Sequence, residues 1–103
     1  MSVQVTVERV AIPGVQREIT SLLRELLSRA VQQSGFQSAE TVVDIFSPTA
    51  FLTISRWTTL NAWQAWERTP DRLRIIERIN ALLQRPPTIR LWNEDPDAPP
   101  PAA

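Results

Sequence analysis

Apolar and polar positions alternate at the start of the chain. The stretch "SVQVTVE" (residues 2–8) places Val3, Val5 and Val7 on one face and polar side chains on the other. This period of two predicts a half-buried β-strand. "IPG" (residues 12–14) breaks the pattern.

From Val15 the apolar positions recur every three to four residues. They are Val15, Ile19, Leu22, Leu23, Leu26, Leu27, Ala30 and Val31. This stripe predicts an amphipathic helix. Gly35 suits the C-terminal end of that helix, where a left-handed residue is often needed.

Three further segments have the composition of strands. "FQSAETVVDIF" (residues 36–46) predicts the second strand, "SPT" (47–49) a turn, and "AFLTISRW" (50–57) the third strand, which is rich in β-branched and aromatic residues. "TIRLWNE" (88–94) predicts the last strand.

Two helices are expected between the third and fourth strands. The first covers "LNAWQAWE" (residues 60–67), with Thr58 or Thr59 as its N-cap. The second covers "TPDRLRIIERINALLQ" (69–84), where Thr69 is the cap and Pro70 takes the first helical position. Its expected buried stripe is Leu73, Ile76, Ile79 and Leu83, widened by Ile75 and Leu82.

The element order β-α-β-β-α-α-β predicts an α+β fold of the ferredoxin-like type, an antiparallel sheet with helices on one face. We expect one domain over residues 1–94 and a Pro-rich C-terminal tail over 95–103. The face of the sheet away from the helices still carries apolar side chains. A homodimer packed sheet against sheet would bury them.

Composition excludes several classes of chemistry. The chain has 11 positive and 11 negative side chains, and it contains no His and no Cys. A balanced charge argues against nucleic-acid binding, and the missing residue types exclude Ser-His-Asp or Cys-His nucleophiles and His- or Cys-ligated metals. We expect no metal and no cofactor. No apolar run approaches the ~20 residues that span a bilayer, and the N-terminus lacks a signal-peptide pattern, so we expect a cytoplasmic protein that does not contact membranes.

"GFQSAE" (residues 35–40) and "FLTISRWTTLNAWQAWERTPDR" (51–72) resemble the antibiotic biosynthesis monooxygenase family over roughly residues 1–94. The resemblance implies a dimeric α+β barrel of ferredoxin-like subunits. The better understood oxygenases of that family use no metal and no flavin. They bind an electron-rich phenol between sheet and helices, and the deprotonated substrate passes an electron to O₂.

The resemblance also assigns site residues. Trp57 matches a conserved strand Trp, and Thr53 takes the position of an Asn that helps hold the substrate oxygen, so these two are the candidate catalytic residues. The expected substrate-binding residues are Trp63, Trp66, Ser55, Phe36, Phe51 and Arg90, with Trp63 at the position of a family Tyr. Heme degradation is disfavoured, because that branch of the family pairs the Trp matched by Trp66 with a His that falls on Ile76.

Simpler interpretations stand beside these assignments. Thr53 and Ser55 can form local hydrogen bonds while Trp57 is simply a core residue. Trp63 and Trp66 have the spacing of an ordinary packed pair on one helix face. Arg90 either faces an anionic ligand or pairs with a carboxylate such as Glu40 or Asp44. The resemblance implies a cofactor-independent monooxygenase acting on a small aromatic, quinol-type or polyketide-like substrate. The alternative is a non-catalytic dimeric domain that binds a small hydrophobic ligand.

Overall fold

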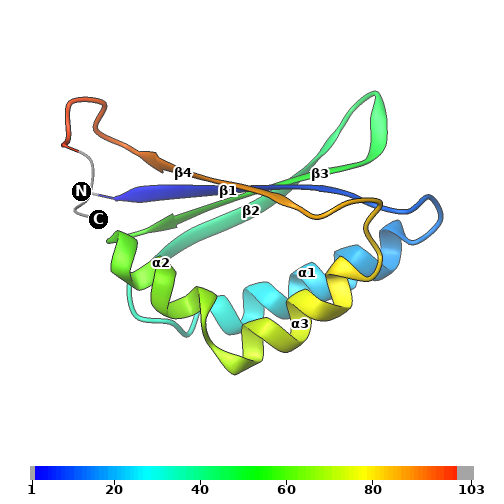
Figure 1. The fold of residues 1–103 in the computed structure, drawn as a ribbon, viewed down its shortest axis with the longest axis horizontal. Coiled ribbons are helices and arrows are strands. Elements are labelled where there is room, and N and C mark those ends of the chain that lie inside the picture. Colours follow the sequence, from blue (N-terminus) through cyan, green and yellow to red (C-terminus); the bar gives the residue numbers. More distant parts are fainter. Residues whose placement is uncertain (1, 100–103) are drawn as a thin grey trace.

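The computed structural model describes residues 2–99. It has the predicted α+β architecture, with a four-stranded sheet above a layer of helices (Figure 1). The elements in chain order are β1 (Val3–Val10), α1 (Gln16–Ala30), β2 (Phe36–Asp44), β3 (Ser47–Trp57), α2 (Leu60–Glu67), α3 (Pro70–Asn80) and β4 (Thr88–Asn93).

The strand order is β2-β3-β1-β4, and all neighbours are antiparallel. β1 pairs with β3 from Val3 opposite Trp57 to Val10 opposite Ala50. Directly opposed residues point to the same face of a sheet. The helix-facing side therefore receives alternate residues of each strand: Val5, Val7 and Arg9 from β1, and Phe51, Thr53, Ser55 and Trp57 from β3.

The predicted caps of the two later helices are confirmed. Thr59 Oγ1 accepts from the backbone N–H of Ala62 at 3.1 Å, and Thr69 Oγ1 accepts from that of Arg72 at 3.4 Å. Each hydroxyl satisfies one of the N–H groups that a helix start leaves open. The first cap fixes the entry of α2, which carries Trp63 and Trp66.

The apolar core has two parts. One cluster lies around α1 and α3 and comprises Ala11, Ile19, Leu22, Leu23, Phe51, Ile75, Ile79 and Leu83. The other is rich in tryptophan and comprises Val5, Val7, Ala30, Trp57, Trp63 and Trp66. Leu26 of α1 packs against both.

The turn between β2 and β3 lies earlier than predicted. It falls at Ile45 and Phe46, whereas residues 47–49 already belong to β3. Asp44 Oδ1 accepts from the backbone N–H of Phe46 at 2.8 Å, a local bond of the kind by which Asp favours turns. Pro48 is accommodated because its position near the hairpin end requires no ladder N–H.

Helix α3 also differs from its prediction. It ends at Asn80 rather than Gln84, because the backbone there turns to pair with the end of β1: Gln84 N–H donates to the Val10 carbonyl at 2.8 Å. Its buried face contains Arg72, Ile75 and Ile79, while Leu73 is 52% exposed. The expectation that Leu73 is buried was wrong.

Gly35 does not end α1, which stops at Ala30 with Val31 as a right-handed cap. It lies in the turn before β2 with φ +85°, and its carbonyl accepts from the Thr58 N–H at 2.8 Å. A Cβ at this position would lie 2.5 Å from Ala62 Cβ. Close approach to α2, together with the left-handed backbone, therefore requires glycine here.

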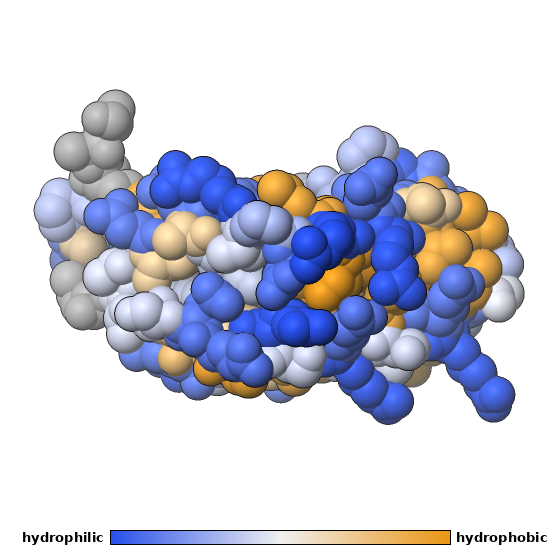
Figure 2. All heavy atoms as spheres, turned by 90° about the horizontal axis from the view of Figure 1, so that it is seen from below, coloured by the Kyte–Doolittle hydropathy of each residue, from blue (hydrophilic) through white to orange (hydrophobic). Residues whose placement is uncertain are grey.

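Viewed from the helix side, hydrophilic side chains cover most of the surface, with hydrophobic groups between them (Figure 2). Among the described helices, none is long and apolar enough to cross a membrane. β4 ends at Asn93, and part of the expected tail, residues 100–103, lies outside the described residues. The domain boundary at residue 94 stays a prediction.

Candidate functional site

A cavity of about 320 Å³ lies between the helix-facing side of the sheet and the helices. This volume falls at the lower end of the roughly 300–1,000 Å³ typical of small-molecule sites. Its apolar walls come from both core clusters and from β2, including Val7, Leu23, Leu26, Ala30, Phe36, Val43, Phe51, Trp57, Trp63 and Trp66. The cavity therefore lies where the two halves of the core meet.

Trp57 is fully buried at the centre of an aromatic cluster. Its ring meets that of Phe36 edge to face at 5.4 Å, meets Trp63 at 5.9 Å, and stacks against Trp66 at 6.4 Å. The indole Nε1–H donates to Ser55 Oγ at 3.0 Å. Trp57 is thus both a core residue and a wall of the cavity. Its one side-chain donor, the indole N–H, is already hydrogen-bonded to Ser55.

Thr53 presents the polar group on the same face of β3. Its Oγ1 accepts from Arg9 Nη1 at 3.2 Å and shares a hydrogen bond with Thr41 Oγ1 at 2.9 Å. The three residues come from β1, β3 and β2, which lie side by side in the sheet. Together they form a polar cluster within an otherwise apolar lining.

Arg9 is the most unexpected member of this cluster. It is only 3% exposed, and its Nε–H is buried without a hydrogen-bond partner. Burial, and secondly the positive charge of Arg72, lower the pKa of Arg9 to about 10. Desolvation disfavours the charged guanidinium, so Arg9 is a costly residue in the ligand-free protein.

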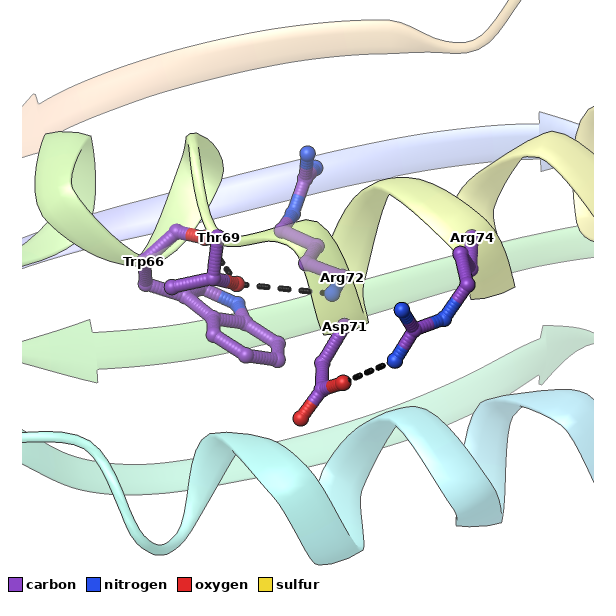
Figure 3. Close-up of polar contacts among 5 residues, drawn as sticks. All are labelled: Trp66, Thr69, Asp71, Arg72 and Arg74. Atoms are coloured by element: carbon purple, nitrogen blue, oxygen red, sulfur yellow. Dashed lines mark hydrogen bonds and ion pairs between the residues drawn. The ribbon is translucent and has the colours of Figure 1, made fainter.

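Arg72 brings a second buried guanidinium from α3. It is 6% exposed, donates from Nη1 to the Glu67 carbonyl at 3.3 Å, and lies 5.2 Å over the Trp63 ring. Figure 3 shows its side chain rising toward the sheet, whereas Asp71 and Arg74 pair on the other side of the helix. Burial lowers the pKa of Arg72 against the opposing charge of Glu67.

Neither buried arginine makes an ion pair within residues 2–99. The ion pairs of that part of the chain are Arg56–Glu94, Arg74–Asp71 and Arg78–Glu25, all partly exposed. Among residues 2–99, Glu40 is the only acidic residue in the cavity lining, and it is exposed. Across the same residues, no group of three or more acidic side chains comes together as a metal site would require.

Most of the residues predicted from sequence are brought together here. Those that line the cavity are Trp57, Thr53, Ser55, Phe36, Phe51, Trp63 and Trp66. Arg90 is not among them. It lies opposite Thr6 on the outer face of the sheet, and its guanidinium stacks 4.4 Å from the ring centre of Trp92.

The sequence analysis missed Arg9 and Arg72. The alternation that marks Val3, Val5 and Val7 as buried places Arg9 on the same face, once β1 is extended by two residues. Arg72 lies three residues before Ile75 and seven before Ile79, the spacing of one helix face. Because Leu73 is apolar, the sequence analysis placed Leu73 rather than Arg72 on the buried face of the helix.

Comparison with solved structures supports the fold. A conserved protein from Methanosarcina mazei superposes with a TM-score of 0.87 at 13% identity, covering 92% of this chain and 94% of its own. The cofactor-independent oxygenase SnoaB from Streptomyces nogalater gives 0.84 at 17% identity, covering 96% and 98%. A protein described as an antibiotic biosynthesis monooxygenase gives 0.83 at 23% identity, covering 91% and 99%.

Among functionally curated proteins, no sequence matches this chain. The sequence profile of the antibiotic biosynthesis monooxygenases, in contrast, matches residues 2–78, most of the folded part of the chain. The chain therefore belongs to the antibiotic biosynthesis monooxygenase family.

Proposed function

We propose that the protein is a cofactor-independent monooxygenase acting on a small electron-rich aromatic substrate of the quinol or polyketide-phenol type. The observation that carries this proposal is the cavity itself. Its walls are aromatic and apolar, and they enclose a hydroxyl–guanidinium cluster of Thr53 and Arg9. Family membership and the similarity to SnoaB agree with it.

In this proposal the substrate supplies the electrons. Loss of a proton gives a phenolate or enolate, which passes an electron to O₂. A C–O bond then forms at the activated carbon. One oxygen atom remains there as a carbonyl while the other leaves as water, so a CH₂ group becomes C=O with no external reductant.

The chain's own residues bind the substrate and stabilise its charge. Thr53 Oγ1 and the Arg9 guanidinium hold the substrate oxygen, because charge-assisted donors in a dry site favour the anionic form. Trp57, Phe36 and Phe51 hold the rings and exclude water, and Trp63 and Trp66 close the helix side. Because Ser55 already occupies the indole N–H of Trp57, Trp57 acts as a wall rather than as a donor.

The second candidate is a dimeric domain that binds a small hydrophobic ligand without turnover. It is favoured by Thr53, a shorter side chain than the Asn of the oxygenases that the sequence resembles, and by Trp63, which lacks the hydroxyl of their Tyr. Under this alternative, ligand raises the melting temperature without oxygen uptake.

We further propose a homodimer packed through the outer face of the sheet. Leu52 and Ile54 of β3 lie on that face, half-buried, and Val42 and Trp92 are 45% and 42% exposed there. Light scattering should show a dimer that Ile54→Lys dissociates. Leu73→Lys, at an exposed position on the helix side, should leave the mass unchanged.

Oxygen consumption against a panel of anthrones, naphthols and dihydroquinones tests the oxygenase. We expect uptake above the protein-free rate that persists after chelation and falls in Trp57→Phe, with Arg74→Met as a control outside both the cavity and the proposed dimer face. Uptake equal to autoxidation for every compound would contradict the oxygenase and favour the binding domain.

A further inference from the structure

We infer that the cavity binds a planar aromatic ligand that carries an anionic oxygen group, a carboxylate or an ionised phenol, between the guanidinium groups of Arg9 and Arg72. This inference rests on the proposed function, because it concerns the same cavity and defines the charge of its ligand. Its test is a binding measurement, independent of turnover.

The charge balance of the cavity is the first argument. Arg9 and Arg72 are 3% and 6% exposed, and neither has an ion-pair partner within residues 2–99. Buried charges are normally paired, because desolvation without a counter-charge is expensive. Glu40 does not supply the counter-charge, since it is exposed and pairs in register with Ile54, on the face of the sheet away from the helices.

The free donors are the second argument. A guanidinium carries five N–H groups. In Arg9, Nη1 is bonded to Thr53 and Nε has no partner; in Arg72, Nη1 is bonded to the Glu67 carbonyl. Both side chains therefore keep donors for a ligand, in the fork geometry that suits a carboxylate or phenolate oxygen.

The placement of the two cations is the third argument. Arg9 lies on β1 of the sheet, and the Arg72 side chain comes from α3 (Figure 3). Both line the cavity, so the two charges reach it from opposite layers. In addition to the effect of burial, the positive charge of Arg72 is near enough to Arg9 to lower the pKa of the Arg9 guanidinium. An anion between them replaces this repulsion by two attractions, which a neutral ligand cannot do.

The aromatic half of the ligand follows from the remaining walls. Trp57, Trp66 and Phe36 line the same cavity as the two arginines. Flat rings against these side chains place the anionic substituent at the polar cluster. The ligand class is thus an aromatic acid or an acidic phenol rather than a neutral hydrocarbon.

Equilibrium dialysis at about pH 8 with three ligands of similar size tests the inference. 2-Naphthoate carries a carboxylate, 4-nitro-1-naphthol is an ionised phenol at this pH, and 2-naphthamide is the neutral isostere. We expect at least one anion to bind roughly 30-fold or more tightly than the amide, the scale expected for a desolvated charge pair. The anion that is preferred identifies the source of the anionic oxygen.

Arg9→Met and Arg72→Met should each remove most of this preference while retaining binding of 2-naphthamide, which also reports an intact cavity. Arg74→Met is the matched control, because Arg74 lies on the same helix but pairs with Asp71 away from the sheet (Figure 3). Arg9→Lys and Arg72→Lys, which keep the charge, should retain part of the preference.

Equal binding of all three ligands, a preference that survives both Met substitutions, or no binding of any ligand would overturn the inference. Anion preference without oxygen uptake on the panel would leave it standing and remove only the oxygenase. Oxygen uptake with no anion preference would contradict the anionic-ligand inference and leave the oxygenase standing.

Discussion

Arg9 Nη1 on β1 donates to Thr53 Oγ1 on β3 at 3.2 Å, although the two residues are 44 positions apart in sequence. This bond is the one side-chain hydrogen bond of the Arg9 guanidinium within residues 2–99. It joins the residue that the family resemblance selected to a residue that the sequence analysis did not consider.

Thr53→Val should destabilise the protein. The substitution keeps the shape of the side chain but removes the acceptor for Arg9, which leaves a further buried donor unpaired. We expect the free energy of unfolding to fall by about 1–3 kcal/mol in urea titration. Thr41→Val removes only the hydroxyl–hydroxyl bond and is the matched control; an equal loss for both variants would show that the Arg9 contact contributes nothing.

Arg9→Met should stabilise the ligand-free protein. The variant keeps much of the apolar stem and removes a buried charge that lacks a counter-charge. Replacing buried ions by apolar groups is typically neutral to stabilising by about 1–4 kcal/mol. Urea unfolding checks this, and Arg74→Met, at an exposed site, should stay within about 0.5 kcal/mol of the parent. A variant less stable than the parent would contradict the cost assigned to Arg9.

The advantage of Arg9→Met should depend on pH in one direction. The pKa of Arg9 is about 10 in the folded protein, below its ordinary value in the unfolded chain. Between these values the unfolded chain holds a proton that the folded protein has released, so rising pH stabilises the parent relative to the variant. We expect a constant difference below about pH 9 that shrinks above pH 10.

Among residues 2–99, the other charged residues that line this cavity are Arg72, Arg24 and Glu40, and the register of Glu40 with Ile54 places the Glu40 side chain on the outer face of the sheet. In an Arg72→Met background, the repulsion that adds to burial in lowering the pKa of Arg9 is absent. The stability difference between Arg9→Met and the parent should therefore begin to shrink at a higher pH. If the difference in the free energy of unfolding between Arg9→Met and the parent grew with pH, the lowered pKa of Arg9 would be contradicted.

Gly35→Ala should be strongly destabilising. The new Cβ would lie 2.5 Å from Ala62 Cβ and 2.7 Å from Thr58 Oγ1, and the backbone at φ +85° is left-handed. Overpacking and the conformational penalty together cost about 2–5 kcal/mol. Gly14→Ala isolates the second effect, because its φ is +98° with nothing within 4 Å. Thermal melts of the two variants should therefore differ clearly, and equal losses would rule out the contact with α2.

Ser55→Ala should reveal how Trp57 is held. It removes the acceptor at 3.0 Å and leaves a buried indole N–H unpaired, for an expected loss of about 1–3 kcal/mol. In a Trp57→Phe background there is no N–H to leave unpaired, so the same change should cost much less. A double-mutant cycle from denaturant titrations measures this difference, and strictly additive losses would contradict the bond.

Much of the fold was predictable because local signals agree with it. Thr59 and Thr69 mark helix starts, and the alternation of Phe51, Thr53, Ser55 and Trp57 gives the inner face of β3. The end of α3 was misplaced because a tertiary contact decides it: the Gln84 N–H donates to the Val10 carbonyl of β1. The hairpin turn was misplaced for a local reason, because Asp44 Oδ1 accepts a hydrogen bond from the backbone N–H of Phe46.

The candidate site was only half predictable for a related reason. Aromatic residues and hydroxyls on β3 reveal its walls, but its charges occupy positions where charge is ordinarily excluded. Arg9 lies on a buried strand face, and Arg72 lies beside the apolar Leu73 on α3. Prediction from sequence patterns assigns arginine to the surface, so it does not identify buried arginines such as Arg9 and Arg72.

The division of the core into two clusters bears on how the molecule unfolds. Leu26 packs against both clusters, and the cavity with its charged residues occupies the region between them. We expect this layout to give two cooperative units with a weak boundary, in which backbone amides beside the cavity exchange with solvent sooner than those within either cluster. A ligand that fills the cavity would pack against both apolar clusters, and the two clusters would then unfold in a single cooperative transition.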